Sequence, residues 1–275
     1  MDRRTFLGAA GMAVVAGCSN GGSSRSEATG TPTPTPTPTP TGTGSADFAF
    51  EGVDAPDEVE LNDPFSFAIR VRNAGSGRGT FTSVLSTKVD DGEWRALGGK
   101  VSMTLDGGES GVWESPDLTL RYLSTVSFRL DAIDETWRTD VVPKRLPFGE
   151  SYTTPSGLLL SILGGSFEST YPDEDGTPAP DGQVWAVMRV DVRNSRQEVQ
   201  PTPEASTFTL DVDGDEREMD QSVTDDPYED GSLAGRGGRR GDLVYAVPEG
   251  TAADDVSVTW GQSTDRGELR AIWGA

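Results

Sequence analysis

The sequence after residue 46 predicts an all-β fold of two β-sandwiches in tandem. Apolar and polar residues alternate along short segments, and in residues 65–73 this places Phe65, Phe67, Ile69 and Val71 on one face. A period of two is typical of a strand with one buried face. Turn-forming Asp and Gly residues separate the segments, and no segment has a convincing helical period. Short strands at this spacing are typical of sandwiches.

The predicted strands fall into two sets. The first set, within residues 46–145, comprises 48–53, 65–73, 80–89, 94–97, 101–105, 111–114, 126–133 and 136–142. The second set, within residues 146–275, comprises 158–163, 184–194, 207–212, 216–219, 242–247, 256–260 and 268–273. The even positions of 184–194 form the predicted buried face, which leaves Trp185 on the other face. Partial exposure of Trp185 is one interpretation, and packing in a core or between domains is the one we favour. Asp213-Gly214 predicts a hairpin turn.

One internal echo links the two sets. Ile-Arg-Val-Arg-Asn ends a long strand at Asn73, and Val-Asp-Val-Arg-Asn ends another at Asn194. Asparagine at a strand exit can bond to nearby backbone and so start the following loop. The echo predicts two related sandwiches; chance similarity over so short a match is the alternative.

The N-terminus carries an export signal. Paired Arg3 and Arg4 precede an uncharged run, residues 7–17, that is too short to span a bilayer. The pair resembles a twin-arginine signal, and Val-Ala-Gly before Cys18 resembles a lipobox, which implies a lipid on Cys18. We therefore predict a signal peptide over 1–17. Residues 18–45 form a predicted disordered linker, in which Thr-Pro repeats favour an extended stalk.

Charge and composition restrict the function. The chain has 45 acidic and 23 basic residues, a formal net charge of −22, and only three lysines. Such a surface resembles that of proteins from salt-loving archaea, where molar salt screens the repulsion among carboxylates. We expect the fold to need high salt. Nucleic acid is excluded as a partner, since phosphate binding needs a basic face.

The chemistry of most enzymes is also excluded. The chain has no histidine, and Cys18 is its only cysteine. Catalytic triads, thiol nucleophiles, histidine-ligated zinc and the usual neutral-pH base are therefore absent. No motif singles out a pair of carboxylates for hydrolysis. We predict no catalytic residues and no cofactor.

Two groups of charged residues are candidate sites. Asp173, Asp175, Asp213 and Asp215 are the calcium candidates. The last two lack a glutamate at the spacing of a calcium loop, so we favour a solvated acidic surface and no metal.

The glycine-rich segment 235–241 holds the basic candidates, Arg236, Arg239 and Arg240. Their guanidiniums could bind anions or a partner. The simpler interpretation is a flexible loop that neutralises acidic neighbours.

Family resemblance agrees with the strand pattern. Val-Arg-Asn-Ala-Gly at 71–75 and Leu-Asp-Gly-Gly-Glu-Ser at 105–110 resemble a CARDB-type immunoglobulin-like domain over 46–145. The segments 190–194, 208–214 and 241–248 are similar to the DUF4352 or telokin-like immunoglobulin fold over 146–275. These resemblances imply two immunoglobulin-like sandwiches in a haloarchaeal twin-arginine lipoprotein. Neither family implies catalytic residues, and members of both are commonly secreted or anchored accessory modules.

The sequence thus predicts a binding module at the outer face of the cytoplasmic membrane, exported by the twin-arginine route and held by lipidated Cys18. We expect it to engage a protein or glycan of the envelope. Two alternatives stay open: a structural spacer or accessory subunit of a surface complex, and a secreted carboxylate-dependent hydrolase.

Overall fold

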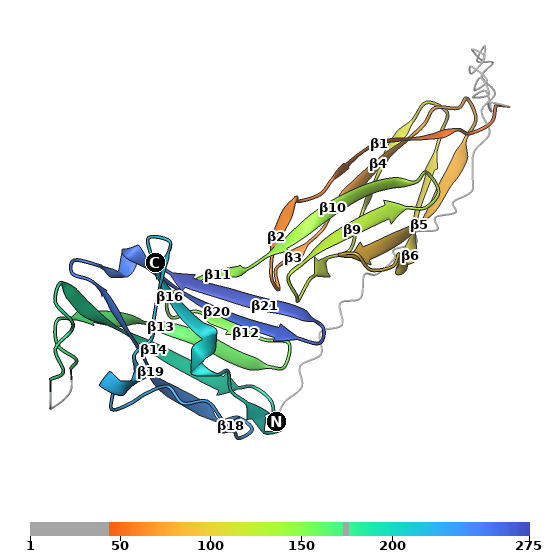
Figure 1. Ribbon diagram of the computed structural model, residues 1–275. Helices are drawn as coiled ribbons and strands as arrows, with labels where there is room; N and C mark the ends of the chain where they lie inside the picture. The colour runs from red at the N-terminus through yellow and green to blue at the C-terminus, as the bar shows by residue number, and fades with distance from the viewer. Residues whose placement is uncertain (1–43, 173–175) are drawn as a thin grey trace, which may run out of the picture. The chain divides into compact units, whose positions relative to one another are not determined.

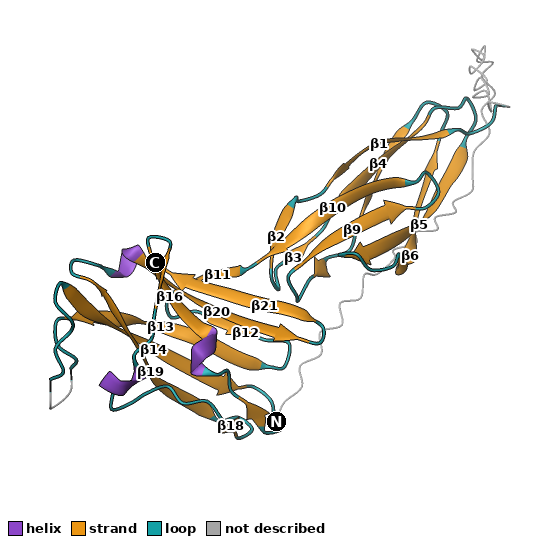
Figure 2. Ribbon diagram, viewed as in Figure 1, coloured by secondary structure: helices purple, strands orange, loops and turns teal. Residues whose placement is uncertain are grey.

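A computed structural model describes residues 44–172 and 176–275. Within them the chain forms two immunoglobulin-like β-sandwiches, which confirms the predicted fold class (Figure 1). The helical residues of this part are confined to three short 3-10 helices, Ala205–Thr207, Gln221–Val223 and Ala253–Asp255, and turns and loops form the other connections (Figure 2). None of its helices has the length and apolar character needed to cross a membrane. Arg3, Arg4, Cys18, Asp173 and Asp175 lie outside the described residues.

The first sandwich packs a three-stranded sheet against a five-stranded one. In order, these sheets contain β1 (Phe48–Asp54), β4 (Ala68–Asn73) and β7 (Ser110–Glu114), and β2 (Glu58–Glu60), β10 (Glu135–Val142), β9 (Ser124–Leu130), β5 (Gly79–Val89) and β6 (Arg95–Leu105). A further short pair joins β3 (Pro64–Phe65) and β8 (Leu118–Thr119). All the pairings are antiparallel except that of β2 with β10.

The second sandwich packs a five-stranded sheet against a four-stranded one. The first of these contains β11 (Lys144–Pro147), β21 (Gly267–Gly274), β20 (Val256–Thr264), β16 (Phe208–Val212) and β17 (Asp215–Arg217), and the second contains β12 (Ser151–Thr153), β13 (Leu158–Glu168), β14 (Gln183–Asn194) and β19 (Gly238–Pro248). A short pair joins β15 (Gln200–Pro201) and β18 (Ser232–Leu233). The assignment of 46–145 and 146–275 as separate domains stays a prediction.

The alternating residues form the cores as predicted. Ile69 and Val71 of β4, and Val190 and Val192 of β14, are fully buried. The predicted strands 94–97 and 101–105 are one strand, β6, because Gly98 and Gly99 adopt positive φ and let the chain continue through a distortion. The strands that sequence reasoning missed are two to four residues long, too short to show a period.

The two echo asparagines perform the same structural role. Asn73 accepts hydrogen bonds at Oδ1 from Asp47 N (3.0 Å) and Gly75 N (3.1 Å), and its Nδ2 donates to Gly77 O (2.7 Å) and Leu105 O (3.2 Å). Asn73 is fully buried. The side-chain oxygen and both amide hydrogens are therefore all bonded to backbone groups, and two of the four bonds, to Gly75 and Gly77, fasten the loop after β4.

Asn194 repeats the pattern after β14. Its Oδ1 accepts from Arg196 N (2.9 Å), and its Nδ2 donates to Glu198 O (2.7 Å) and to the carbonyls of Leu233 and Ala234 (3.4 and 3.3 Å). In both sandwiches the asparagine Oδ1 accepts a bond from the backbone N two residues later in the sequence, and Nδ2 donates a bond to the carbonyl four residues later. This shared geometry favours related sandwiches over chance similarity.

Trp185 is buried, as the favoured interpretation predicts, although it lies on the strand face opposite the main core. Only 4% of it is accessible, and its Nε1 donates to Thr177 O at 3.1 Å. It packs with Tyr171, Val187, Val223 and Val244 in a second apolar cluster, on the face of β14 opposite the main core. Segments beyond the strand cover this part of the sheet, and alternation within one strand cannot reveal such a cover.

Candidate functional site

A hollow of about 680 Å³ lies on the second sandwich, beside the strand exit of Asn194. We call it the arginine groove. It is lined by Leu159, Asp191, Arg193, Asn194, Ser195, Arg236, Gly237, Gly238, Arg239 and Arg240. The groove brings together all three arginines that the sequence singled out.

The strand register places the charged side chains. On β14, Val190 and Val192 enter the core, so Asp191 and Arg193 lie on the opposite face. In the antiparallel pairing with β19, Asp191 lies opposite Arg240 and Arg193 lies opposite Gly238. Paired strands thus hold two arginines and one aspartate side by side.

Asp191 links the two arginines. Its Oδ2 accepts hydrogen bonds from Arg193 Nε (3.1 Å), Arg193 Nη2 (2.8 Å) and Arg240 Nη2 (3.0 Å). The Asp191 side chain is 5% exposed, whereas those of Arg193 and Arg240 are 61% and 53% exposed. A buried carboxylate therefore fixes the position of two guanidiniums that face solvent.

Asp191 is favoured in its ionised form in the folded protein. Burial opposes its ionisation, but the hydrogen bonds from Arg193 and Arg240 outweigh that effect and hold the pKa of Asp191 below its ordinary value. Each guanidinium has five N–H donors, and Asp191 takes only two from Arg193 and one from Arg240. Most donors of the pair remain uncommitted within the described part of the chain.

The three sequence-predicted arginines differ in environment. Arg239 Nη1 donates to Glu229 O at 2.8 Å, so this side chain secures the segment next to β19. Arg236 lies in the preceding turn at φ 62°, and its backbone N donates to Arg196 O at 2.9 Å. Only Arg240 joins Asp191. The expectation of a loop over 235–241 is wrong from Gly238 onward, because β19 starts there and pairs with β14.

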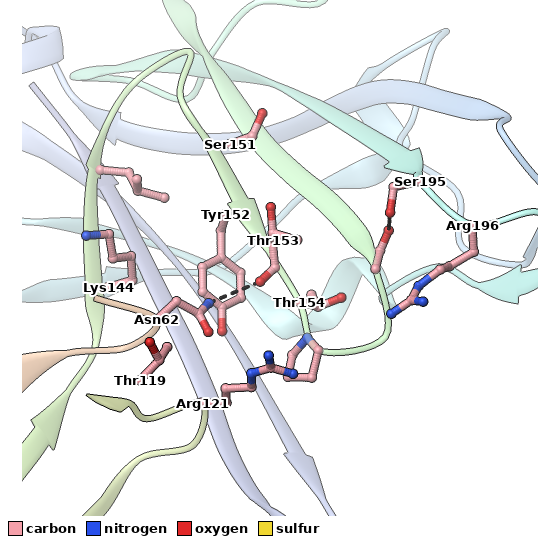
Figure 3. Close-up of a pocket in the computed structure, with 13 residues that line it drawn as sticks. Asn62, Thr119, Arg121, Lys144, Ser151, Tyr152, Thr153, Thr154, Ser195 and Arg196 are labelled. Carbon is pink, nitrogen blue, oxygen red and sulfur yellow. Dashed lines mark hydrogen bonds between the residues drawn. The ribbon is translucent and has the colours of Figure 1, made fainter. Parts of the chain in front are cut away.

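Ser195, in the loop after β14, lines one side of the groove. Figure 3 shows a neighbouring pocket, in which Ser195 and Arg196 of this loop are labelled. Ser195 Oγ donates to Gly157 O at 2.6 Å. Gly157 has φ +93°, a backbone conformation that residues with a Cβ rarely adopt, so glycine is favoured at this turn. The exposed Arg196 adds a further positive charge beside the groove.

Sequence reasoning missed Asp191, Arg193 and Arg196. The first two belong to the echo segment Val-Asp-Val-Arg-Asn, where the polar positions alternate with the buried valines. That pattern predicts two outward charges. It does not reveal that β19 brings Arg240 to the same carboxylate, because the register of two distant strands is needed for that.

A second polar network fastens the segments that cover Trp185. Arg189 bridges Asp242 (Nη1 to Oδ1, 2.8 Å) and Asp226 (Nη2 to Oδ2, 2.7 Å). Tyr171 Oη contacts Thr224 Oγ1 at 2.6 Å and donates to Asp242 Oδ2 at 3.2 Å. These side chains hold neighbouring segments in place and do not line the groove.

The described calcium candidates form a turn. Asp213 (φ 53°) and Gly214 (φ 90°) connect β16 to β17, and Gly214 N donates to Asp211 Oδ1 at 2.9 Å. The Asp215 side chain is 81% exposed. In the part of the chain that the structure describes, no three His, Cys, Asp or Glu residues form a group that could hold a metal ion. The hairpin by itself accounts for Asp213-Gly214.

Comparison with known proteins assigns no family. No family model matches the chain, and no curated protein does. A candidate lipoprotein of Bacillus subtilis, ycdA, is 13% identical over 45% of this chain and 38% of its own, with a TM-score of 0.33. An uncharacterized β-sandwich protein of Clostridium difficile is 14% identical over 48% of this chain and 94% of its own, with a TM-score of 0.32. Red sea bream transglutaminase is 13% identical over 83% of this chain and 31% of its own, with a TM-score of 0.33. Likenesses of this size carry no argument about activity, and the CARDB-type and DUF4352 resemblances stay predictions.

Proposed function

We propose that this protein is a non-catalytic binding module of the cell surface, which engages an acidic partner through the arginine groove. One observation carries the proposal: Asp191 holds Arg193 and Arg240 in place, with more than half of each arginine side chain exposed. In a chain of net charge −22, such a concentration of arginines is the natural contact for an anion. Because the paired strands fix the arginines beforehand, binding costs little conformational entropy.

The groove does not fit the alternative of a carboxylate-dependent hydrolase. That chemistry uses two carboxyl groups, one of them an acid with a raised pKa. Asp191 is the one carboxylate among the residues that line the groove, and its pKa is lowered. The site is therefore suited to binding an anion and not to donating a proton.

Anchoring is the second part of the proposal: export by the twin-arginine route and a lipid on Cys18 at the outer face of the cytoplasmic membrane. Cys18→Ser is expected to release the protein from the membrane fraction or to stop its processing, because no lipid can then be attached. Fractionation and immunoblotting of the two chains measure this. Unchanged membrane retention of Cys18→Ser would refute the lipid anchor.

Site-specific crosslinking tests the binding surface. Since Cys18 is the only cysteine, an introduced cysteine is the single free thiol once Cys18 carries its lipid. Leu159→Cys places the thiol on the groove, and Val112→Cys, at a residue 54% exposed on β7, is the matched control. With a maleimide–benzophenone crosslinker, whose photoactivated ketone inserts into C–H bonds of proteins and polysaccharides alike, we expect one dominant partner, protein or glycan, from Leu159→Cys on intact cells and none from Val112→Cys. The same diffuse profile from both positions would favour a structural spacer.

A further inference from the structure

The donors of the arginine groove suit a carboxylate. Arg193 and Arg240 already meet one carboxylate oxygen, Asp191 Oδ2, at 2.8 and 3.0 Å. Their two guanidiniums therefore lie close enough to share an anion, and the planar fork of N–H groups on arginine matches carboxylate geometry. A carboxylate arriving from solvent would meet the donors that Asp191 leaves uncommitted.

The rest of the lining indicates a hydrated ligand. Leu159 is the one large apolar side chain among the residues that line the groove, and no aromatic residue joins it. Interfaces with folded proteins usually centre on buried aromatic or other apolar anchors. The large exposed apolar residues of the described chain lie elsewhere: Val89, Leu97, Val112, Leu163 and Val199. The groove therefore favours a polar polymer over the surface of a folded partner.

Resting on the proposed binding function of the groove, we propose that its ligand is an acidic polysaccharide, whose sugar carboxylates bind Arg193 and Arg240. Leu159 supplies an apolar surface for a sugar ring. The ligand carries repeated carboxylates, so several anchored copies of the protein on one membrane would bind one polymer with increased avidity. In molar salt the Debye length falls to about 3 Å, so short hydrogen bonds of fixed geometry dominate over bulk charge.

Binding of the detergent-solubilised full chain to three polymers in molar KCl tests the ligand class. The probes are polygalacturonate, uncharged dextran and poly-L-glutamate, measured by biolayer interferometry. We expect binding to polygalacturonate, none to dextran, and binding of poly-L-glutamate weaker by about tenfold or more. Equal or tighter binding of poly-L-glutamate, or no binding of polygalacturonate, would overturn the inference.

Two variants locate the contact. The groove variant combines Asp191→Asn, Arg193→Gln and Arg240→Gln, so that no buried charge loses its partners. The control combines Arg72→Gln and Arg78→Gln, at side chains 52% and 71% exposed on the first sandwich.

We expect the groove variant to bind polygalacturonate about tenfold more weakly or worse, and the control to bind normally. Thermal unfolding checks that both variants are folded. An equal loss in the control would overturn the inference.

Asp191→Asn alone separates geometry from charge. It removes one negative charge from the groove, which raises the net charge there by one, but it also removes the carboxylate that fixes both arginines, so we expect weaker binding of polygalacturonate. Tighter binding would contradict the inference. If polygalacturonate does not bind while Leu159→Cys still crosslinks a single envelope partner, the proposed binding function stands and the polysaccharide inference is refuted.

Discussion

Replacing Asn73 by alanine is expected to lower the free energy of unfolding by about 2–4 kcal/mol. The side chain is fully buried and makes four hydrogen bonds to backbone groups around β4, and alanine can make none of them. Burying polar groups without partners costs about 1–3 kcal/mol each, and partial entry of water reduces the sum. Urea unfolding in molar KCl measures the loss.

Asn194→Ala is expected to behave in the same way, because its side chain makes the equivalent bonds after β14. Thr80→Ala is the control: its hydroxyl makes one exposed contact with Thr104, so its loss should stay below about 1 kcal/mol. A small effect of Asn73→Ala, comparable with that of Thr80→Ala, would contradict the role assigned to the asparagines.

Replacing Asp191 by asparagine is expected to lower the free energy of unfolding by about 1–2 kcal/mol at neutral pH. The carboxylate is buried, but solvent screens its partners Arg193 and Arg240, so the expected loss lies below that for a fully buried ion pair. Asparagine keeps the shape and removes the charge. Urea unfolding at a series of pH values measures the difference from the unchanged chain.

The pH dependence of this loss has a definite sign. Because the pKa of Asp191 is lower in the folded chain, its contribution is fully present above the ordinary aspartate value of about 4 and is lost as the pH falls through the folded value. The two proteins should therefore converge in acid. Asp215→Asn, at a side chain 81% exposed, should change little at any pH. A gap between Asp191→Asn and the unchanged chain that persists in acid would refute the electrostatic explanation.

The sequence predicts the strands best where one face is buried over several residues. Ile69 and Val71, like Val190 and Val192, alternate with polar neighbours, and that alternation is sufficient to identify β4 and β14. The echo that ends at Asn73 and Asn194 also has a direct physical basis, because both amides fasten the loop that follows. Trp185 shows the limit: whether an outward face is covered depends on segments distant in the sequence.

The site was predictable in part. A glycine-rich run with three arginines is visible in the sequence, and the structure places Arg236, Arg239 and Arg240 on one groove. Their separate environments depend on the start of β19 at Gly238 and on its register with β14. Asp191 is one of 45 acidic residues, and only the pairing of these two strands distinguishes it from the others.

Crosslinking from Leu159→Cys, in a chain that also carries Asp191→Asn, Arg193→Gln and Arg240→Gln, tests the binding role of the groove most directly. The thiol stays in the same place on the sheet, while the guanidiniums of Arg193 and Arg240 and the carboxylate that fixes them are gone. We predict that the yield of the dominant partner falls about tenfold or more relative to Leu159→Cys alone, on intact cells in molar salt. An unchanged yield of the same partner would contradict the account.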